Sequence, residues 1–164
     1  MNCQNCGAPL QLTLDKGHYE CQYCGAIYFP REVREGMISL GNNTDLECKL
    51  CHFPLAMAWV DRYQLLFCEK CKGKLIPSAV FEHLIDFLRA SSDKPAAIPP
   101  PMNPEELKRK IECPKCHQWM DTHPYGGHGN IIIDNCPRCA LNWLDHHELM
   151  KIVYAPNRRI SPKY

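Results

Sequence analysis

The stretch that decides the fold is Cys113-Pro114-Lys115-Cys116, followed after 19 intervening residues by Cys136-Pro137-Arg138-Cys139. Each half is a Cys-x-x-Cys pair, the spacing at which two thiolates on one tight turn bind the same metal ion. Two such pairs supply four thiolates, which is a full tetrahedral ligand set for zinc. The stretch therefore predicts a zinc ribbon, in which a β-hairpin joins two turns that carry cysteines.

The same arrangement occurs twice more in the 164-residue chain, so the sequence contains an internal repeat. The first two groups have 14 and 16 residues between their pairs, and none of the twelve cysteines is left over. We therefore predict three structural zinc ions per chain. Their predicted ligands are Cys3, Cys6, Cys21 and Cys24, then Cys48, Cys51, Cys68 and Cys71, then Cys113, Cys116, Cys136 and Cys139.

The cysteine pattern favours metal over disulfides. Units of roughly 40 residues bury too little apolar surface to fold without a metal or disulfides. Secreted disulfide scaffolds seldom place every cysteine at one spacing, and the sequence starts Met1-Asn2-Cys3 without an apolar signal stretch. We therefore expect a reducing, cytoplasmic compartment. No run approaches the roughly 18 apolar residues of a membrane helix, so no membrane partner is expected.

The predicted fold class is a small, metal-stabilised, β-rich protein with three tandem zinc ribbons and short α-helices after ribbons 2 and 3. The clearest helix is expected from Ser78 to about Ala90, where apolar residues recur at three- and four-residue spacing. The predicted divisions are ribbon 1 at 1–30, a polar linker at 31–47, ribbon 2 with its helix at 48–91, a proline-rich linker at 92–102, ribbon 3 with flanking helices at 103–155, and a tail at 156–164.

Local patterns place the smaller elements. Alternating or apolar runs predict strands, and Asn103 and Asp145 are expected to cap helices, with Glu106 and Glu148 in capping boxes. Gly7 and Gly25 follow cysteine pairs at points where the chain must curl with a positive φ. The expected strands are 10–14, 18–21, 118–122 and 131–134, with a turn at 123–130. An apolar segment at 27–29 follows the second knuckle, and a tight turn at Asp61-Arg62 joins the segments 56–60 and 63–68.

The third unit carries further residues in a specific pattern around its cysteines. Ile133-Asp134 precedes the second pair, and Trp143-Leu144-Asp145 and Glu148-Leu149 follow it. This segment, residues 113–153, resembles the bacterial zinc-finger family named for the zinc ribbon of transcription factor IIB. That family often has two glycines after the last cysteine, where this chain has Ala140-Leu141. The resemblance implies zinc and a ribbon fold, and it does not establish a role in transcription.

The first two units resemble that family less closely. The second, from 48 to about 89, has Leu75-Ile76-Pro77 in place of the Trp-Leu-Asp segment. The first resembles a generic zinc ribbon. Because Cys-x-x-Cys-Gly turns stand at both of its ends, a rubredoxin-like iron site is the alternative to zinc there.

Charge argues against broad binding to nucleic acid. The formal net charge is +1, and each zinc with four thiolates contributes about −2, so the loaded protein carries about −5. Binding to a phosphate backbone needs a clustered basic face. The two basic runs, at 70–74 and 108–110, are interpreted as solvated surface.

The cysteines and histidines argue against an enzyme. Four cysteines close the coordination shell of each zinc, so no position remains for an activated water. No free nucleophile stands beside a base with an orienting carboxylate. Six histidines are interpreted as surface or cap residues, or as neighbours of the metal sites: His123, His128, His146 and His147, and, directly after knuckle cysteines, His52 and His117.

The sequence is typical of a non-catalytic interaction module whose partner is another protein. Exposed edges of the ribbons, or the helix at 78–90, are the expected contact surfaces. The first alternative is a nucleic-acid-associated ribbon protein of the transcription type, in which Tyr23, Trp59, Trp119 or Trp143 stack on bases. The second alternative is a redox or metal-responsive sensor that uses labile thiolates.

Overall fold

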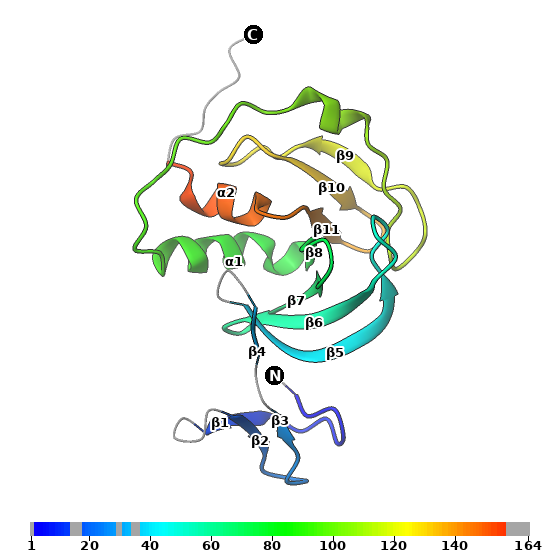
Figure 1. Cartoon of the computed structure of the whole chain (residues 1–164), viewed down its shortest axis with the longest axis vertical. Coiled ribbons are helices and arrows are strands. Elements are labelled where there is room, and N and C mark those ends of the chain that lie inside the picture. Colours follow the sequence, from blue (N-terminus) through cyan, green and yellow to red (C-terminus); the bar gives the residue numbers. More distant parts are fainter. Residues whose placement is uncertain (1, 14–17, 29–30, 34–36, 157–164) are drawn as a thin grey trace.

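Among the residues that the structure describes, two β-sheets and two α-helices make up the fold (Figure 1). The computed structural model describes residues 2–13, 18–28, 31–33 and 37–156. A three-stranded sheet holds the first ribbon. An eight-stranded antiparallel sheet holds the strands from Arg31 to Leu144, and it curves around α1 and α2 (Figure 1).

The first ribbon is a three-stranded meander of β1 (Leu10–Thr13), β2 (His18–Cys21) and β3 (Ile27–Tyr28). Leu10 pairs with Cys21, and Tyr19 pairs with Tyr28, so both cysteine turns lie at one end of the hairpin. These strands confirm the predicted hairpin within the described residues; Leu14 of the predicted strand at 10–14 and Phe29 of the apolar segment at 27–29 lie outside them. The ribbon lies apart from the two helices (Figure 1).

The second and third ribbons share one sheet. Its strand order is β4-β5-β6-β7-β8-β11-β10-β9, where β4 is Arg31–Val33 and β5 is Met37–Glu47. Ribbon 2 contributes β6 (Pro54–Val60), β7 (Tyr63–Cys68) and β8 (Lys74–Pro77), and ribbon 3 contributes β9 (Asp121–Pro124), β10 (Ile132–Cys136) and β11 (Leu141–Leu144). β8 pairs with β11, so the ladder runs without a break from one ribbon into the other.

Residues 31–47 are not the polar linker that we expected. The described residues there form β4 (Arg31–Val33) and β5 (Met37–Glu47), and β5 pairs along β6. Gly41 and Asn43, which resemble turn signals, instead lie where the register of β5 against β6 shifts, and Gly41 has a φ of 70°. A bulge absorbs an extra residue without ending the strand, which is why turn-forming residues occur inside it.

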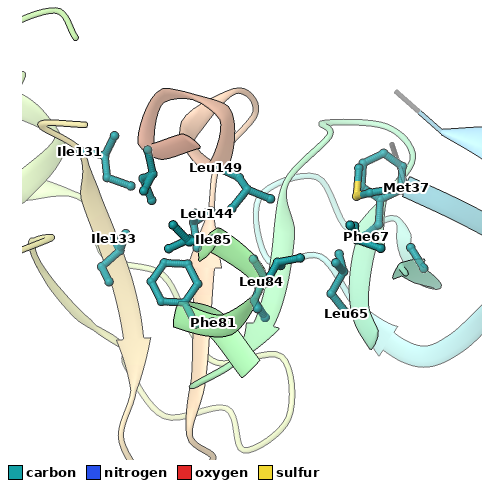
Figure 2. Packing of buried hydrophobic residues seen from close by; sticks show 14 residues of the cluster. Met37, Leu65, Phe67, Phe81, Leu84, Ile85, Ile131, Ile133, Leu144 and Leu149 are labelled. Carbon is teal, nitrogen blue, oxygen red and sulfur yellow. The ribbon is translucent and has the colours of Figure 1, made fainter. Parts of the chain in front are cut away.

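The helices pack against one face of the large sheet. α1 (Ser78–Ala90) has the predicted bounds and packs against α2 (Glu148–Tyr154). Phe81, Leu84 and Ile85 of α1 are buried in a core that includes Phe67 and Leu144 of the sheet (Figure 2). The apolar face of α1 is therefore occupied by the protein's own core, which leaves only the polar side of this helix for a partner.

The helix starts of the third unit differ in detail from the expectation. Asn103 accepts a hydrogen bond from the Glu105 N–H at 3.1 Å and caps a 3₁₀ helix, η1 (Pro104–Lys108). α2 begins at Glu148, preceded by His147 in a left-handed conformation, while the Glu148 carboxylate accepts from the Asp145 N–H at 2.7 Å. One half of the expected capping box is therefore present, and the helix starts later than predicted.

The proline-rich segment at 92–102 packs against the third unit and is not a spacer without contacts. The Ala97 N–H donates to the Tyr154 carbonyl at 2.7 Å, and Pro99 is buried. Asn130 donates from its side chain to the Pro100 carbonyl at 3.4 Å. The segment thus crosses the end of α2 and connects the helix of ribbon 2 to η1 (Figure 1).

The first strand of ribbon 3, β9, starts three residues later than the predicted strand at 118–122. Trp119, which lies before it, forms an isolated bridge with Glu112. Among the described residues, every helix is too short or too polar to cross a bilayer.

Candidate metal centres

Each predicted group of four cysteines comes together in space. Within each group, the four Sγ atoms all lie within 4.8 Å of one another. The structure therefore gathers every sequence-predicted ligand into three groups of four thiols, and the groups that could hold a metal among the described residues contain cysteines alone. They are Cys3, Cys6, Cys21 and Cys24; Cys48, Cys51, Cys68 and Cys71; and Cys113, Cys116, Cys136 and Cys139.

The sulfur separations fit zinc and exclude disulfides. The Sγ atoms of Cys51 and Cys68 are 3.3 Å apart, and those of Cys116 and Cys136 are 3.6 Å apart. A disulfide would require about 2.05 Å. Four sulfurs placed tetrahedrally at about 2.3 Å from one zinc ion lie about 3.8 Å from each other. The three groups therefore fit three zinc ions, each with a complete set of four ligands.

A repeated backbone turn, here called the knuckle, positions the cysteines. In the knuckle that begins at Cys113, the His117 N–H donates to the Cys113 carbonyl at 2.9 Å, and the Cys113 N–H donates to the Gln118 carbonyl at 2.8 Å. The knuckles that begin at Cys3, Cys21, Cys48 and Cys68 repeat both bonds. The turn directs backbone N–H groups at sulfur, as in the 3.5 Å approach of the Cys71 N–H to Cys68 Sγ.

The fourth residue after the first cysteine of each pair has a left-handed backbone in all six knuckles. The two predicted cases, Gly7 and Gly25, have φ of 75° and 70°. The other four positions hold residues with a side chain, for which this conformation is unfavourable. These are His52 at 55°, Lys72 at 64°, His117 at 59° and Ala140 at 51°.

The first site differs from the other two in its surroundings. Cys6 and Cys24 are exposed, whereas the corresponding cysteines of the second and third sites are half-buried. The second and third sites also share one apolar cluster, which contains Leu55, Leu75 and Trp143. The two C-terminal sites are therefore parts of one packed unit, and the N-terminal site depends on its own small ribbon.

Hydrogen bonds and burial act on the thiols in opposite directions. The Tyr28 hydroxyl lies 3.4 Å from Cys3 Sγ and lowers the pKa of that thiol to about 6. The backbone N–H of Gln118 lowers the pKa of Cys116 to about 7. Burial raises the pKa of Cys71 to about 11, so this thiol stays protonated near neutral pH until a cation replaces its proton. Metal uptake therefore releases protons.

A buried ionic cluster stabilises the third ribbon. The Arg109 guanidinium pairs with Asp134 on β10 and with Asp145 after β11, and the Asp134 side chain is fully buried. Thr122 donates to Asp134 as well. These carboxylates raise the pKa of Arg109 against the opposing effect of its burial. The segment before the first knuckle is thus tied to the strands that carry the second knuckle.

The family-like Trp-Leu-Asp segment has a structural role at this cluster. Trp143 is fully buried, and its Nε1–H donates to the Asp145 carboxylate at 2.9 Å. Its ring also covers Gly73 of ribbon 2, where an added Cβ would lie 2.2 Å from the indole. The tryptophan therefore joins the ionic cluster of ribbon 3 to the last knuckle of ribbon 2.

Sequence reasoning missed this cluster and part of its surroundings. The runs at 70–74 and 108–110 look solvated in the sequence, but Lys74 is buried and Arg109 is half-buried. An Asp and an Arg in separate segments carry no local signal of pairing. Asp134 lies in a strand whose preceding residues, Ile132 and Ile133, are apolar and buried, and that position is the one clue in the sequence.

The histidines do not join the metal groups among the described residues. His52 and His117 are exposed, and each contributes its backbone N–H to a knuckle. His123 is exposed beside the Pro124 carbonyl, 3.1 Å away. The rings of His146 and His147 lie 3.4 Å apart at the start of α2.

Comparison with known proteins identifies the third ribbon. Residues 112–155 match the family model described as transcription factor zinc-finger, which represents the TFIIB-type zinc ribbon. No curated protein and no solved structure matches the chain. The matched segment contains all four cysteines of the third site, the Trp143-Leu144-Asp145 segment and α2. Residues 112–155 are therefore similar to the zinc ribbons of the TFIIB type.

Proposed function

We propose that this chain is a zinc-stabilised, non-catalytic protein whose function is to bind another protein. The zinc ions are assigned a structural role, because a shell of four cysteines has no open position for substrate or activated water. Each ion then holds two knuckles in place. The rigid knuckles then hold exposed side chains in fixed positions for contact with a partner.

Large apolar side chains exposed on the knuckles carry this proposal. Tyr23 is 84% exposed, Trp119 is 62% exposed, and Leu50 and Phe53 are 42% and 39% exposed. Each lies within a Cys-x-x-Cys pair or shortly after it, so every ribbon presents at least one. Aromatic residues on a fixed backbone provide contact area at a small entropic cost, and they are enriched at protein interfaces.

Affinity capture tests the proposal. The tagged full-length chain is expressed at its native level, treated with nuclease and purified, and the co-purifying proteins are quantified by mass spectrometry. We expect a protein partner close to one per chain that is lost in the triple variant Tyr23→Ser, Phe53→Ser, Trp119→Ser. The control is Ile98→Ser, because Ile98 is 89% exposed but lies on the proline-rich segment. If no protein co-purifies, or if the triple variant retains it, the proposal is wrong.

Nucleic-acid binding is the second candidate, and the family match together with the exposed aromatic side chains favours it. Trp119 and Tyr23 present flat rings on which unpaired bases can stack. The burial of Lys74 and Arg109 removes two cations from the surface and counts against it. Fluorescence anisotropy with single-stranded RNA and DNA decides between the candidates. Binding that falls steeply between about 50 and 200 mM salt would support this candidate, and the absence of binding at low salt would contradict it.

A further inference from the structure

An apolar groove lies mainly on the face of the large sheet opposite to α1 and α2, and it extends to Val80 at the start of α1. Side chains alternate between the two faces of a strand. Leu65 and Ile76 belong to the core under the helices, whereas their neighbours Leu66 and Leu75 point to the other face. The groove has a volume of about 570 Å³. It is lined by Leu46, Arg62, Gln64, Leu65, Leu66, Leu75, Pro77, Val80, Lys115 and Leu141.

The lining combines an apolar floor with two cationic side chains. Two of its residues are charged, Arg62 in the β6–β7 turn and Lys115 in the first knuckle of ribbon 3, and both are exposed cations. None of the described residues in the lining is acidic. Arg62 already pairs with exposed Asp61 at 3.0 Å, a type of surface pair that contributes little. Lys115 is therefore the better probe of the charge of the groove.

We propose that this groove binds a short segment of a partner protein that carries apolar side chains and at least one carboxylate. The inference rests on the proposed function, and it adds to the exposed knuckle residues a second contact surface together with the chemistry of the partner segment that would bind there. The volume lies in the range of about 300–1,000 Å³ that is typical of ligand sites. Leucine and proline side chains of the partner replace water on the floor, while its carboxylate pairs with Lys115 or Arg62.

Charge also decides against one other occupant. Residues 157–164 of the same chain contain Arg158, Arg159 and Lys163 and no acidic residue. A basic segment beside Lys115 and Arg62 would place like charges together, which costs free energy. An acidic segment of a different protein fits the groove better than this tail does.

The groove continues toward the first ribbon. A second hollow of about 300 Å³ is lined by Trp59 and Met57 of β6 and by Asn2 and Gln4 of ribbon 1. The two hollows share Arg62 and Gln64. A segment longer than the groove can therefore extend past Arg62 and reach the knuckle of ribbon 1.

Selection of peptides on the full-length, zinc-loaded chain tests the inference. The probe is a displayed library of random peptides of about 12 residues, and the most enriched peptide is then synthesised with a fluorescent label. We expect enriched sequences to combine leucine-like residues with Asp or Glu. Lys115→Glu should weaken binding of the labelled peptide by about tenfold, because it places like charges together. Lys70→Glu is the matched control, since Lys70 holds the same position in a knuckle of ribbon 2 but does not line the groove.

Several results would overturn the inference. They are the absence of any enriched peptide, enrichment of basic peptides, or equal binding by the Lys115→Glu and Lys70→Glu variants. Self-association of the chain that Lys115→Glu abolishes would show that a second copy occupies the groove, and would also overturn it. Arg62→Glu repeats the test at a second exposed cation, and native mass spectrometry verifies three zinc ions in each variant.

The affinity capture described above separates the two proposals. A captured partner that the Lys115→Glu variant retains would refute the groove as its site and leave the proposed function intact. The absence of any captured protein would refute the proposed function itself.

Discussion

At the scale of single residues, the knuckles impose a backbone conformation that their sequence only partly suits. The six knuckle positions four residues after the first cysteine of a pair all have a left-handed φ, and only two of them, Gly7 and Gly25, are glycines. A side chain at such a position costs roughly 1–2 kcal/mol relative to glycine in the folded state. The four hydrogen-bonded turns with His, Lys or Ala therefore persist because zinc and the strands around them hold the backbone in place.

Ala140→Gly should stabilise the protein. Glycine relieves the left-handed strain at a φ of 51° and loses part of that gain through its freer unfolded state, for a net of about 0.5–1 kcal/mol. Urea unfolding of the zinc-loaded protein measures the change. Ala79→Gly is the control, because exposed Ala79 lies in α1 and glycine there should destabilise by about 1 kcal/mol. A loss of stability in Ala140→Gly would contradict the strain argument.

Glu148 should make the stability of the protein depend on pH near neutrality. Burial raises the pKa of its carboxyl to about 7 from 4.5. A carboxyl whose pKa is raised on folding binds more protons in the folded state, so its contribution to stability falls as pH rises toward the folded pKa. From pH 6 to pH 8 this contribution should drop by about 1 kcal/mol.

The variant Glu148→Gln tests this, because glutamine can still accept the hydrogen bond from the Asp145 N–H but does not titrate. Urea unfolding at pH 6, 7 and 8, with zinc retained, should show a flatter profile for the variant than for the natural chain. Glu105→Gln, at an exposed position, is the control. Parallel profiles for the natural chain and Glu148→Gln would contradict the prediction.

At the scale of elements, the contact between the two C-terminal ribbons depends on a glycine. Gly73 follows the last knuckle of ribbon 2 and lies directly under the Trp143 ring of ribbon 3. The strands β8 and β11 pair beside this contact, with Leu75 opposite Trp143. The absence of a side chain at Gly73 is what lets the indole fill the space between the two zinc sites.

Gly73→Ala should destabilise the protein by about 1–3 kcal/mol, because the new methyl would overlap the ring of Trp143 and force it to move. Trp143→Phe in the same background should recover part of the loss, since a smaller ring leaves room for the methyl. The control is Gly126→Ala, where an added Cβ meets nothing within 4 Å. Thermal unfolding that is unchanged in Gly73→Ala would show that the ring is not held in place.

The elements that could be predicted from sequence are those with a local signal. The tight turn at Asp61-Arg62 correctly marked the start of the segment that forms β7, and the helical spacing of Val80, Phe81 and Leu84 predicted α1. The cysteine spacing predicted all three metal groups. The strand β5 could not be predicted, because the bulge at Gly41 looks like a turn. The pairing of β8 with β11 could not be predicted either. It is a contact between distant segments that no periodicity within either one encodes.

At the scale of the whole molecule, the three zinc sites differ in how much surrounding structure packs against them. The second and third share an apolar cluster and one sheet, whereas the first is held by a separate three-stranded sheet with two exposed cysteines. Structural zinc contributes on the order of 10–16 kcal/mol to such small units, so loss of the metal unfolds them. Loss of the first ion unfolds only the small first ribbon, whereas loss of the second or third ion unfolds the larger unit that ribbons 2 and 3 share.

Chelation should therefore remove the zinc ions in two steps. A competing chelator should first produce a species with two zinc ions that keeps the signal of the large sheet, and then a metal-free, unfolded chain. Native mass spectrometry and far-UV circular dichroism follow the two steps. Cys24→Ser should resemble the first species, and Cys139→Ser should lose most of the sheet signal. Accumulation of a species with one zinc ion would contradict the cooperation between the second and third sites.

The ladder between β8 and β11 also has a consequence for synthesis on the ribosome. Ser78 and Asn142, which hydrogen-bond at this junction, are 64 residues apart. Ribbon 2 therefore leaves the ribosome with the edge of β8 unpaired and with the part of α1 that packs against ribbon 3 uncovered, and it stays so until ribbon 3 has been translated. A nascent chain in this interval exposes an unpaired strand edge and apolar surface, which are the features that make folding intermediates prone to aggregation and to chaperone binding.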